Sequence, residues 1–285
     1  MRYDPDVQRA VSSYQLGLPK VPVSGRTGDL LGRGTGSSLE FQEYREYMPG
    51  DDIRHLDWGA YARSDTLMVR LYREEISPRT EILIDASASM TTGTPAKSLV
   101  ARQLTALFAL LAGELGGKPG IVPLTDEVPL RTLGIDGLEV LETLPFEGKL
   151  GLDGLLEQNL VPLKKQAVRI VISDFLFPHD PARLVRRLAS EASALWVIQV
   201  LNRWESNPSA LGGRRLTDVE TGAETDLIVN QRAIDEYLRR LGNLQDELLR
   251  NCRRAHATFV TLVADRGLPV LCREELMNAG ILRAE

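Results

Sequence analysis

A short loop of small and hydroxyl residues, Asp85-Ala-Ser87-Ala-Ser89, has the residue types and spacing of a cation site. It follows a short apolar run that predicts a buried strand, and it precedes a predicted helix. Such a loop can turn two hydroxyl oxygens and one carboxylate toward one point, and oxygen ligands suit a hard cation such as Mg²⁺. Asp174 ends a second apolar run and can supply an outer carboxylate. The sequence therefore predicts a metal site of Asp85, Ser87, Ser89 and Asp174.

The residues of this loop support a catalytic site less well than they support a metal site. Ser87 stands where an aspartyl-phosphate hydrolase would place a second acid after Asp85, and neither serine lies in a G-x-S-x-G motif. None of the three histidines is near a motif, and the chain has no P-loop. We therefore expect a protein that is not an enzyme. The alternative is a metal-dependent phosphoester hydrolase at an Asp85/Asp174 crevice, and a purely structural role stays open because Ser and Asp commonly cap the helix that follows a strand.

The elements that must position these side chains alternate between strand and helix from residue 81 onward. Strands are predicted at 81–85, 121–124, 128–133, 168–174, 195–201 and 258–263, and helices at 97–115, 137–144, 152–160, 181–192, 231–254 and 273–277. This alternation predicts a parallel sheet with helices on both faces. Ligands bind such sheets outside the carboxyl ends of the strands, which is where Asp85 and Asp174 lie.

Composition excludes several classes of protein. The chain has 285 residues, of which 43% are hydrophobic and 26% charged, as in an ordinary globular protein. Its net charge of −5 argues against binding to nucleic acid or to an anionic membrane. Two cysteines are too few for a disulfide framework, and no apolar run is long enough to span a bilayer. We expect a cytoplasmic protein.

Composition and predicted secondary structure divide the chain into three parts. Residues 1–38 are rich in Gly, Ser, Pro and Arg and are predicted to be a flexible N-terminal segment. Residues 39–80 are predicted to be β-rich, with a turn at Pro49-Gly50, and to pack on the main domain. Residues 81–285 are predicted to form the main α/β domain.

The loop Asp85–Ser89 and the order of elements after residue 81 resemble the von Willebrand factor A fold. This resemblance implies a doubly wound, mostly parallel sheet with an antiparallel edge, preceded here by a β-rich N-terminal extension. It also implies that the loop forms a metal-ion-dependent adhesion site, with Mg²⁺ as a possible cofactor. In that fold a partner protein completes the metal's shell with its own Asp or Glu, so the resemblance favours a protein-binding adaptor.

A longer motif lies upstream of the sheet. It reads Glu43-Tyr-Arg-Glu-Tyr47-Met-Pro49-Gly50-Asp51-Asp52-Ile-Arg54-His-Leu-Asp57-Trp58, followed by Ala62-Arg63. This stretch resembles the signature of the bacterial domain-of-unknown-function 58 family. Members are often encoded beside MoxR-type AAA+ ATPases, so the resemblance implies such an ATPase, a client protein or both as partners, in protein maturation or complex remodelling.

One departure from the adhesion-site pattern concerns the loop at 146–153. That loop usually supplies a Thr to the metal, and here it contains none. The ammonium of Lys149 can instead occupy the cation's place and neutralise Asp85 and Asp174. A solvated loop lysine is an equally good interpretation, and both stay open.

The signature residues Arg54, Asp57, Trp58 and Arg63 also have two interpretations. They can form a surface that docks a partner, or a clamp in which Trp58 is buried and an ion pair forms between Asp57 and Arg63 or between Asp52 and Arg54. We favour the clamp, because a Trp among Asp and Arg more often packs than reacts.

Overall fold

The computed structural model describes residues 1–18, 39–51, 53–74, 79–127, 130–209, 212–217 and 224–285. The chain divides into two compact units. The main unit comprises residues 1–21 and 78–285, and the inserted unit comprises residues 22–77. No helix in the described ranges is long and apolar enough to cross a membrane.

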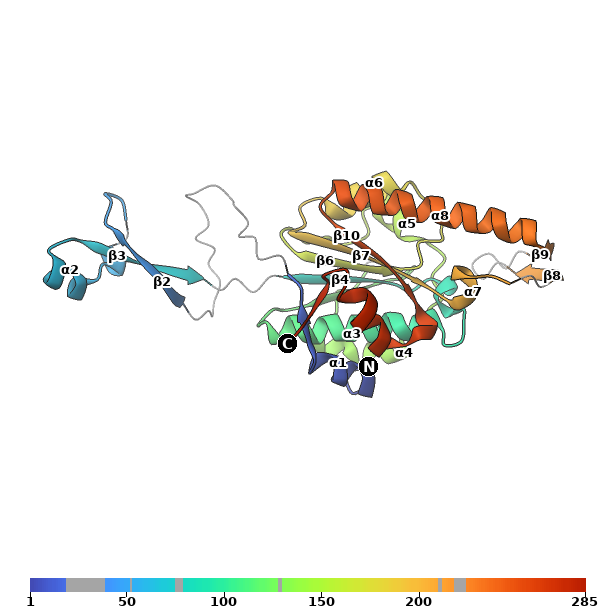
Figure 1. The fold of residues 1–285 in the computed structure, drawn as a ribbon, viewed down its shortest axis with the longest axis horizontal. Coiled ribbons are helices and arrows are strands. Elements are labelled where there is room, and N and C mark those ends of the chain that lie inside the picture. The colour runs from blue at the N-terminus through green and yellow to red at the C-terminus, as the bar shows by residue number, and fades with distance from the viewer. Residues whose placement is uncertain (19–38, 52, 75–78, 128–129, 210–211, 218–223) are drawn as a thin grey trace. The chain divides into compact units, whose positions relative to one another are not determined.

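The main unit is built on a five-stranded sheet, as far as the chain is described (Figure 1). Its strands are β4 (Thr80–Asp85), β5 (Gly120–Leu124), β6 (Val168–Ser173), β7 (Ala194–Leu201) and β10 (Thr258–Val263). They lie in the order β10-β7-β6-β4-β5, and every pair is parallel. The antiparallel edge is one bridge beside β5, where Ile121 and Leu133 exchange backbone hydrogen bonds of 2.8 and 2.7 Å. The predicted fold class, α/β of the von Willebrand factor A type, is confirmed.

Helices cover both faces of this sheet, as Figure 1 shows. One face carries α1 (Pro5–Val11), α3 (Lys97–Glu114), α9 (Leu268–Leu271) and η5 (Cys272–Leu276). The other carries α5 (Leu152–Glu157), α6 (Pro181–Ala189) and α8 (Gln231–Arg254). The connections hold η2 (Ala88–Thr91), η3 (Ile135–Leu138), α4 (Val140–Thr143), α7 (Arg203–Ser206), η4 (Ala264–Arg266) and the hairpin of β8 (Gly212–Thr217) and β9 (Glu224–Val229).

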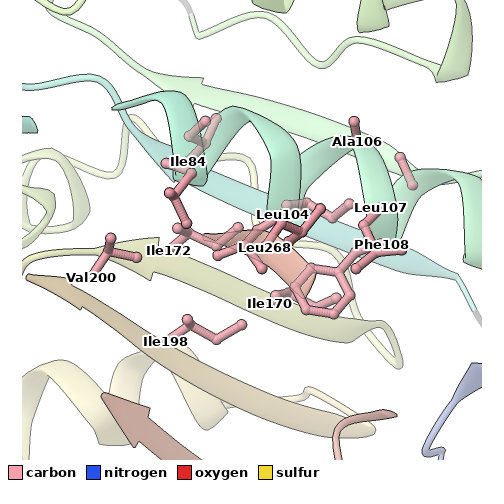
Figure 2. Packing of buried hydrophobic residues seen from close by; sticks show 14 of the residues in the cluster. Ile84, Leu104, Ala106, Leu107, Phe108, Ile170, Ile172, Ile198, Val200 and Leu268 are labelled. Carbon is pink, nitrogen blue, oxygen red and sulfur yellow. The ribbon is translucent and has the colours of Figure 1, made fainter. Parts of the chain in front are cut away.

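Successive strand residues feed two separate hydrophobic cores, because side chains alternate across a sheet. In β4, Ile82 and Ile84 join the core under α3, whereas Leu83 joins the core under α6 and α8. Figure 2 shows the first core, where Leu104 and Phe108 of α3 meet the isoleucines of the sheet. Apolar side chains therefore cover both faces of the sheet, and the polar groups lie at its carboxyl edge.

The first 18 residues are ordered, so the prediction of a flexible segment is wrong for this part of 1–38. Asp4 caps α1 by accepting from two backbone amides, and Pro5 occupies the first helical position. Val7 is fully buried against α3. Strand β1 (Tyr14–Leu16) then pairs antiparallel with β11 (Leu282–Ala284) near the C-terminus. Residues 19–38 lie outside the described residues.

The inserted unit therefore enters the chain between β1 and β4. It contains the antiparallel pair β2 (Leu39–Glu46) and β3 (Met68–Glu74), with η1 (Ile53–His55) and α2 (Trp58–Ser64) between them. The β-rich character predicted for 39–80 is confirmed by this pair. Its packing on the main domain stays a prediction.

A buried ion pair holds the amino edge of the sheet. Arg169 of β6 donates from Nε to Oε2 of Glu81 on β4 at 2.8 Å, and both side chains are 1% exposed. Arg169 also donates to the carbonyl of Lys164 at 2.9 Å, while the Lys164 amide donates to Glu81 at 3.1 Å. The guanidinium and carboxylate are thus satisfied without water, as buried charges require.

Candidate functional site

The order of the strands reverses between β4 and β6, and the predicted site lies at this point. After β4 the chain crosses to β5 on one side, whereas β6 continues toward β7 and β10 on the other. Asp85 ends β4 and Asp174 directly follows β6, so both carboxylates lie at the carboxyl edge beside this switch point. In open α/β sheets this is the position where ligands bind. The two are nevertheless buried, at 2% and 1% exposure.

The Asp85–Ser89 loop is folded around its own polar groups. The Ser87 amide donates to Oδ1 of Asp85 at 2.9 Å, and the hydroxyl oxygens of Ser87 and Ser89 lie 3.0 Å apart. The 146–150 loop runs beside it, since Gly148 exchanges backbone hydrogen bonds with Ala86 and Ala88 at 3.0 and 3.1 Å. A side chain at Gly148 would meet the Ala86 carbonyl at 3.2 Å, so this approach depends on glycine.

The carboxyl group of Asp85 has a raised pKa. Burial is the main cause, and the nearby charge of Asp174 adds to it. Hydrogen bonds from Ser173, whose hydroxyl donates at 2.5 Å, and from Ser87 act in the opposite direction. The site therefore holds a carboxyl group that is costly to ionise.

Lys97 is the residue of this site that the sequence analysis missed. It is the first residue of α3, and its side chain is fully buried. Its Nζ donates to Oδ2 of Asp174 at 2.7 Å and to Oε1 of Glu205 at 2.7 Å. Three segments far apart in the sequence thus meet at one ammonium group.

Glu205 is fixed by the short helix α7. It forms a capping box with Asn202, in which the Glu205 amide donates to the Asn202 side chain and the Asn202 amide donates to Oε2, both at 2.9 Å. The Tyr237 hydroxyl of α8 donates to the Glu205 carbonyl at 2.9 Å. Burial, with the charges of Glu205 and Asp174, raises the pKa of Tyr237 to about 12. Tyr237 therefore stays a donor and ties α8 to the site.

The position of Lys97 runs against the usual preference of a helix. The N-terminus of a helix carries partial positive charge and favours acidic residues. A lysine there is stabilised only by strong compensation, and the two carboxylates provide it. The sequence carries no local signal that this lysine turns inward, since it is one of six lysines and starts a helix that also contains Arg102, Gln103 and Glu114.

We tested whether the predicted donors fit a divalent cation. The donor set is rich in oxygen, as Mg²⁺ requires. However, Oδ2 of Asp174 already accepts from Lys97, both Asp85 oxygens accept from the protein, and Ser87 and Ser89 face each other. As arranged, the residues do not fit a metal.

The side chain of Lys149 is exposed on the neighbouring loop. Its backbone amide donates to the carboxylate of Asp126 at 3.0 Å, and the Leu150 amide donates to the same carboxylate at 3.0 Å. The ammonium that pairs with Asp174 belongs to Lys97, not to Lys149. The prediction that Lys149 neutralises Asp174 is therefore wrong, and the alternative interpretation, a solvated loop lysine, agrees with its exposed side chain.

The signature residues of the inserted unit divide between structure and surface. Asp57 is buried and caps α2, because Oδ1 accepts from the amides of Gly59 and Ala60, and Oδ2 accepts from the Tyr44 hydroxyl at 2.8 Å. Trp58 is 64% exposed, so the expected burial of this side chain is wrong.

Arg54 and Arg63 are exposed as well. Trp58 is the first residue of α2, which Asp57 caps, and its side chain points into solvent at this end of the helix. The expected pair of Asp52 with Arg54 includes a residue outside the described ones. The docking surface stays a prediction.

Comparison with known proteins places this chain in a family. A family model described as "Protein of unknown function DUF58" matches residues 43–247. The chain belongs to this family. The match spans both the signature of the inserted unit and the Asp85–Ser89 loop, in agreement with the resemblance seen in the sequence.

The chain is also similar to curated relatives and to solved structures. The chain is 27% identical over 276 residues to the uncharacterized proteins Rv1480 of Mycobacterium tuberculosis and Mb1516 of Mycobacterium bovis, covering 92% of this chain and 86% of theirs. Among solved structures it is similar to BatB of Bacteroides thetaiotaomicron, with 13% identity, a TM-score of 0.42 and coverage of 71% and 98%. It is also similar to the VWA domain of SpRpn10, with 14% identity, a TM-score of 0.39 and coverage of 67% and 90%.

Proposed function

We propose that this chain is a non-catalytic, cytoplasmic adaptor that binds a MoxR-type AAA+ ATPase, a client protein or both, in protein maturation or complex remodelling. It would do so through the loop face at the carboxyl edge of the sheet, formed by residues 87–92 and 146–150. The proposal rests on the polar cluster beneath this face, formed by Asp85, Lys97, Asp174 and Glu205. Its hydrogen bonds hold the loops in place, and the carboxylates of Asp85 and Asp174 are too deeply buried for a substrate to reach.

Accessibility argues against hydrolysis at Asp85 and Asp174. A nucleophile or base must reach the reacting atoms within hydrogen-bond distance. The two carboxylates are 2% and 1% exposed and already accept hydrogen bonds from the protein. Lys97 donates to two carboxylates, which is the opposite of what a general base does. These contacts favour a structural cluster under a binding face over a reaction centre.

The loop face offers exposed groups for a partner. Lys149 and Leu150 are exposed, the latter at 38%, and their backbone amides are fixed by Asp126. A rigid loop loses little conformational freedom on binding, which favours affinity. The exposed Trp58 of the inserted unit is a second candidate contact, since Trp is enriched in the residues that dominate binding energy.

Direct binding to a purified MoxR-type ATPase from the same organism tests the proposal. Wild type, Lys149→Glu and Trp58→Ala would be compared by biolayer interferometry with the ATPase immobilised. Arg250→Glu, which makes the same charge change at an exposed residue on α8 in the main unit, is the matched control. We expect Lys149→Glu to weaken binding and the control to bind like wild type.

Two outcomes separate the alternatives. Loss of binding only in Trp58→Ala would keep the adaptor and move its contact to the inserted unit, whereas no binding by wild type would contradict partnership with this ATPase. Turnover of an aryl phosphate with Mg²⁺ or Mn²⁺ that disappears in Asp85→Asn would contradict the non-catalytic assignment.

A further inference from the structure

We propose that the ammonium group of Lys97 takes the place of the divalent cation in this von Willebrand factor A-type site, so that the site carries a built-in, non-exchangeable cation. The inference concerns the isolated chain and stands apart from the identity of any partner.

Lys97 places a positive charge directly beside Asp174. Lys97 Nζ lies 2.7 Å from Oδ2 of Asp174, one of the two carboxylates expected to serve a metal. It reaches this point from the start of α3, the first α-helix after the Asp85–Ser89 loop and η2. The cationic group thus comes from the chain itself and pairs with the carboxylate that follows β6.

Lys97 also pairs with a second acid. Glu205 brings a further carboxylate to the same nitrogen at 2.7 Å, although it lies outside the predicted metal set. The Lys97 side chain is 0% exposed to solvent, and its ammonium group is paired with both acids. Buried charges persist in proteins when they are paired and hydrogen-bonded, and both conditions are met here. A divalent cation at the same point would face a fixed positive charge.

Both carboxylate oxygens of Asp85, the other acid of the predicted set, already accept hydrogen bonds from the protein. Asp85 accepts from the Ser87 amide and the Ser173 hydroxyl, while Ser87 and Ser89 lie within hydrogen-bond distance of each other. A metal ligand needs a free lone pair directed at the ion, and a bound Mg²⁺ needs near-octahedral oxygens. These contacts leave Asp85, Ser87 and Ser89 bonded to one another and to Ser173, while the ammonium of Lys97 bonds to Asp174 and Glu205.

One consequence concerns how a partner binds. An adhesion-type metal keeps an open position that a partner's carboxylate can fill. An ammonium has three donors and no coordination position, and this one is out of reach of solvent. A partner would therefore meet the exposed loop groups, and its binding would not require a divalent cation.

Titration with Mn²⁺, followed by its electron paramagnetic resonance signal, tests the proposal on the full chain. Titration to about 10 mM covers weak protein cation sites, whose Kd reaches about 10⁻³ M. Wild type should show no saturable binding that depends on Asp85. Lys97→Ala, which removes the ammonium and leaves space, should gain a saturable site, and Lys97→Ala/Asp85→Asn should lose it again. Arg169→Ala removes a buried cation at the other edge of the sheet and should gain none.

Thermal unfolding provides the second readout, because a ligand that binds only the folded state raises the Tm. Mg²⁺ should raise the Tm of Lys97→Ala and leave that of wild type unchanged. If Lys97→Ala folds only when Mg²⁺ is present, the proposal is supported. Saturable binding by wild type that Asp85→Asn abolishes would overturn it, as would a folded Lys97→Ala without any gain. If Lys97→Ala folds neither with nor without Mg²⁺, the comparison of wild type with Asp85→Asn tests the proposal. Saturable Mn²⁺ binding by wild type that Asp85→Asn abolishes overturns the proposal, and the absence of such binding supports it.

Discussion

Replacing Lys97 by Met tests how strongly the buried ion pair holds the main unit together. Met is similar in length and fills the same volume, but it leaves Asp174 without its cation. The side chains of Lys97 and Asp174 are 0% and 1% exposed, so the pair belongs to the buried class. Removing one partner of such a pair costs about 3–5 kcal/mol, whereas an exposed pair contributes only about 0–1 kcal/mol. We expect the larger loss.

The expected loss is large relative to the whole. Domains are stable by about 5–15 kcal/mol, and in a unit of this size each kcal/mol shifts the Tm by about 2–4 °C. Lys97→Met should therefore lower the Tm by roughly 6–20 °C. The double variant Lys97→Met/Asp174→Asn should recover about 1–3 kcal/mol, because the more deeply buried of the two carboxylates that lose Lys97 is then neutral.

Chemical unfolding followed by tryptophan fluorescence measures these differences. Trp196 is 4% exposed and lies beside Phe108, so its emission reports the main unit. Trp58 and Trp204 are 64% and 40% exposed and should change little. A loss below about 1 kcal/mol in Lys97→Met would refute the reasoning, since that is the range of exposed pairs. A double variant no more stable than the single one would refute it as well.

Three further predictions concern the same unit. Burial raises the pKa of Asp85, so the ionised group opposes folding at neutral pH, and this cost disappears as the pH falls toward 4. In urea titrations, Asp85→Asn should therefore be more stable than wild type at pH 7, and the difference should become smaller toward pH 4. A variant that is less stable than wild type at pH 7 would contradict this prediction. Arg169→Met should cost about 3–5 kcal/mol in the same titrations, because it strands the buried carboxylate of Glu81; a cost near zero would contradict the account of that pair. Val7→Asp should cost about 2 kcal/mol or more by placing a charge in the core under α1, and calorimetry showing an unchanged Tm would mean that α1 is not docked on α3.

Periodic apolar patterns predicted the sheet well. The runs ending at Asp85 and Asp174 are β4 and β6, and the alternating helices and strands between them gave the parallel order and the side of the sheet that carries the site. These features follow from local pattern and from the rule that parallel strands share one carboxyl edge.

The partner of Asp174 could not be read in the same way. Residues 97, 174 and 205 are joined only by the folded chain, and nothing local marks Lys97 as a residue that turns inward. The loop at 146–153 drew attention to Lys149 because it occupies the place of a family ligand. Long-range contacts of this kind depend on how α3 and α7 meet over the sheet.

The N-terminal helix was missed although its signal was present. Asp4-Pro5 starts α1 with the same cap and first-turn proline that correctly predicted α6 at Asp180-Pro181. The helix is only seven residues long, so it shows little periodicity, and its stability comes from packing on α3. Trp58 was misjudged because the usual burial of Trp outweighed the geometry of the cap at Asp57.

The central claim, that a lysine ammonium occupies the cation position of this site, is tested most directly by anomalous diffraction from crystals of the full chain soaked in Mn²⁺. We predict no manganese peak between Asp85 and Asp174, with the Lys97 side chain ordered against Asp174 and Glu205. A manganese peak at that point, with the Lys97 side chain displaced, would contradict the account.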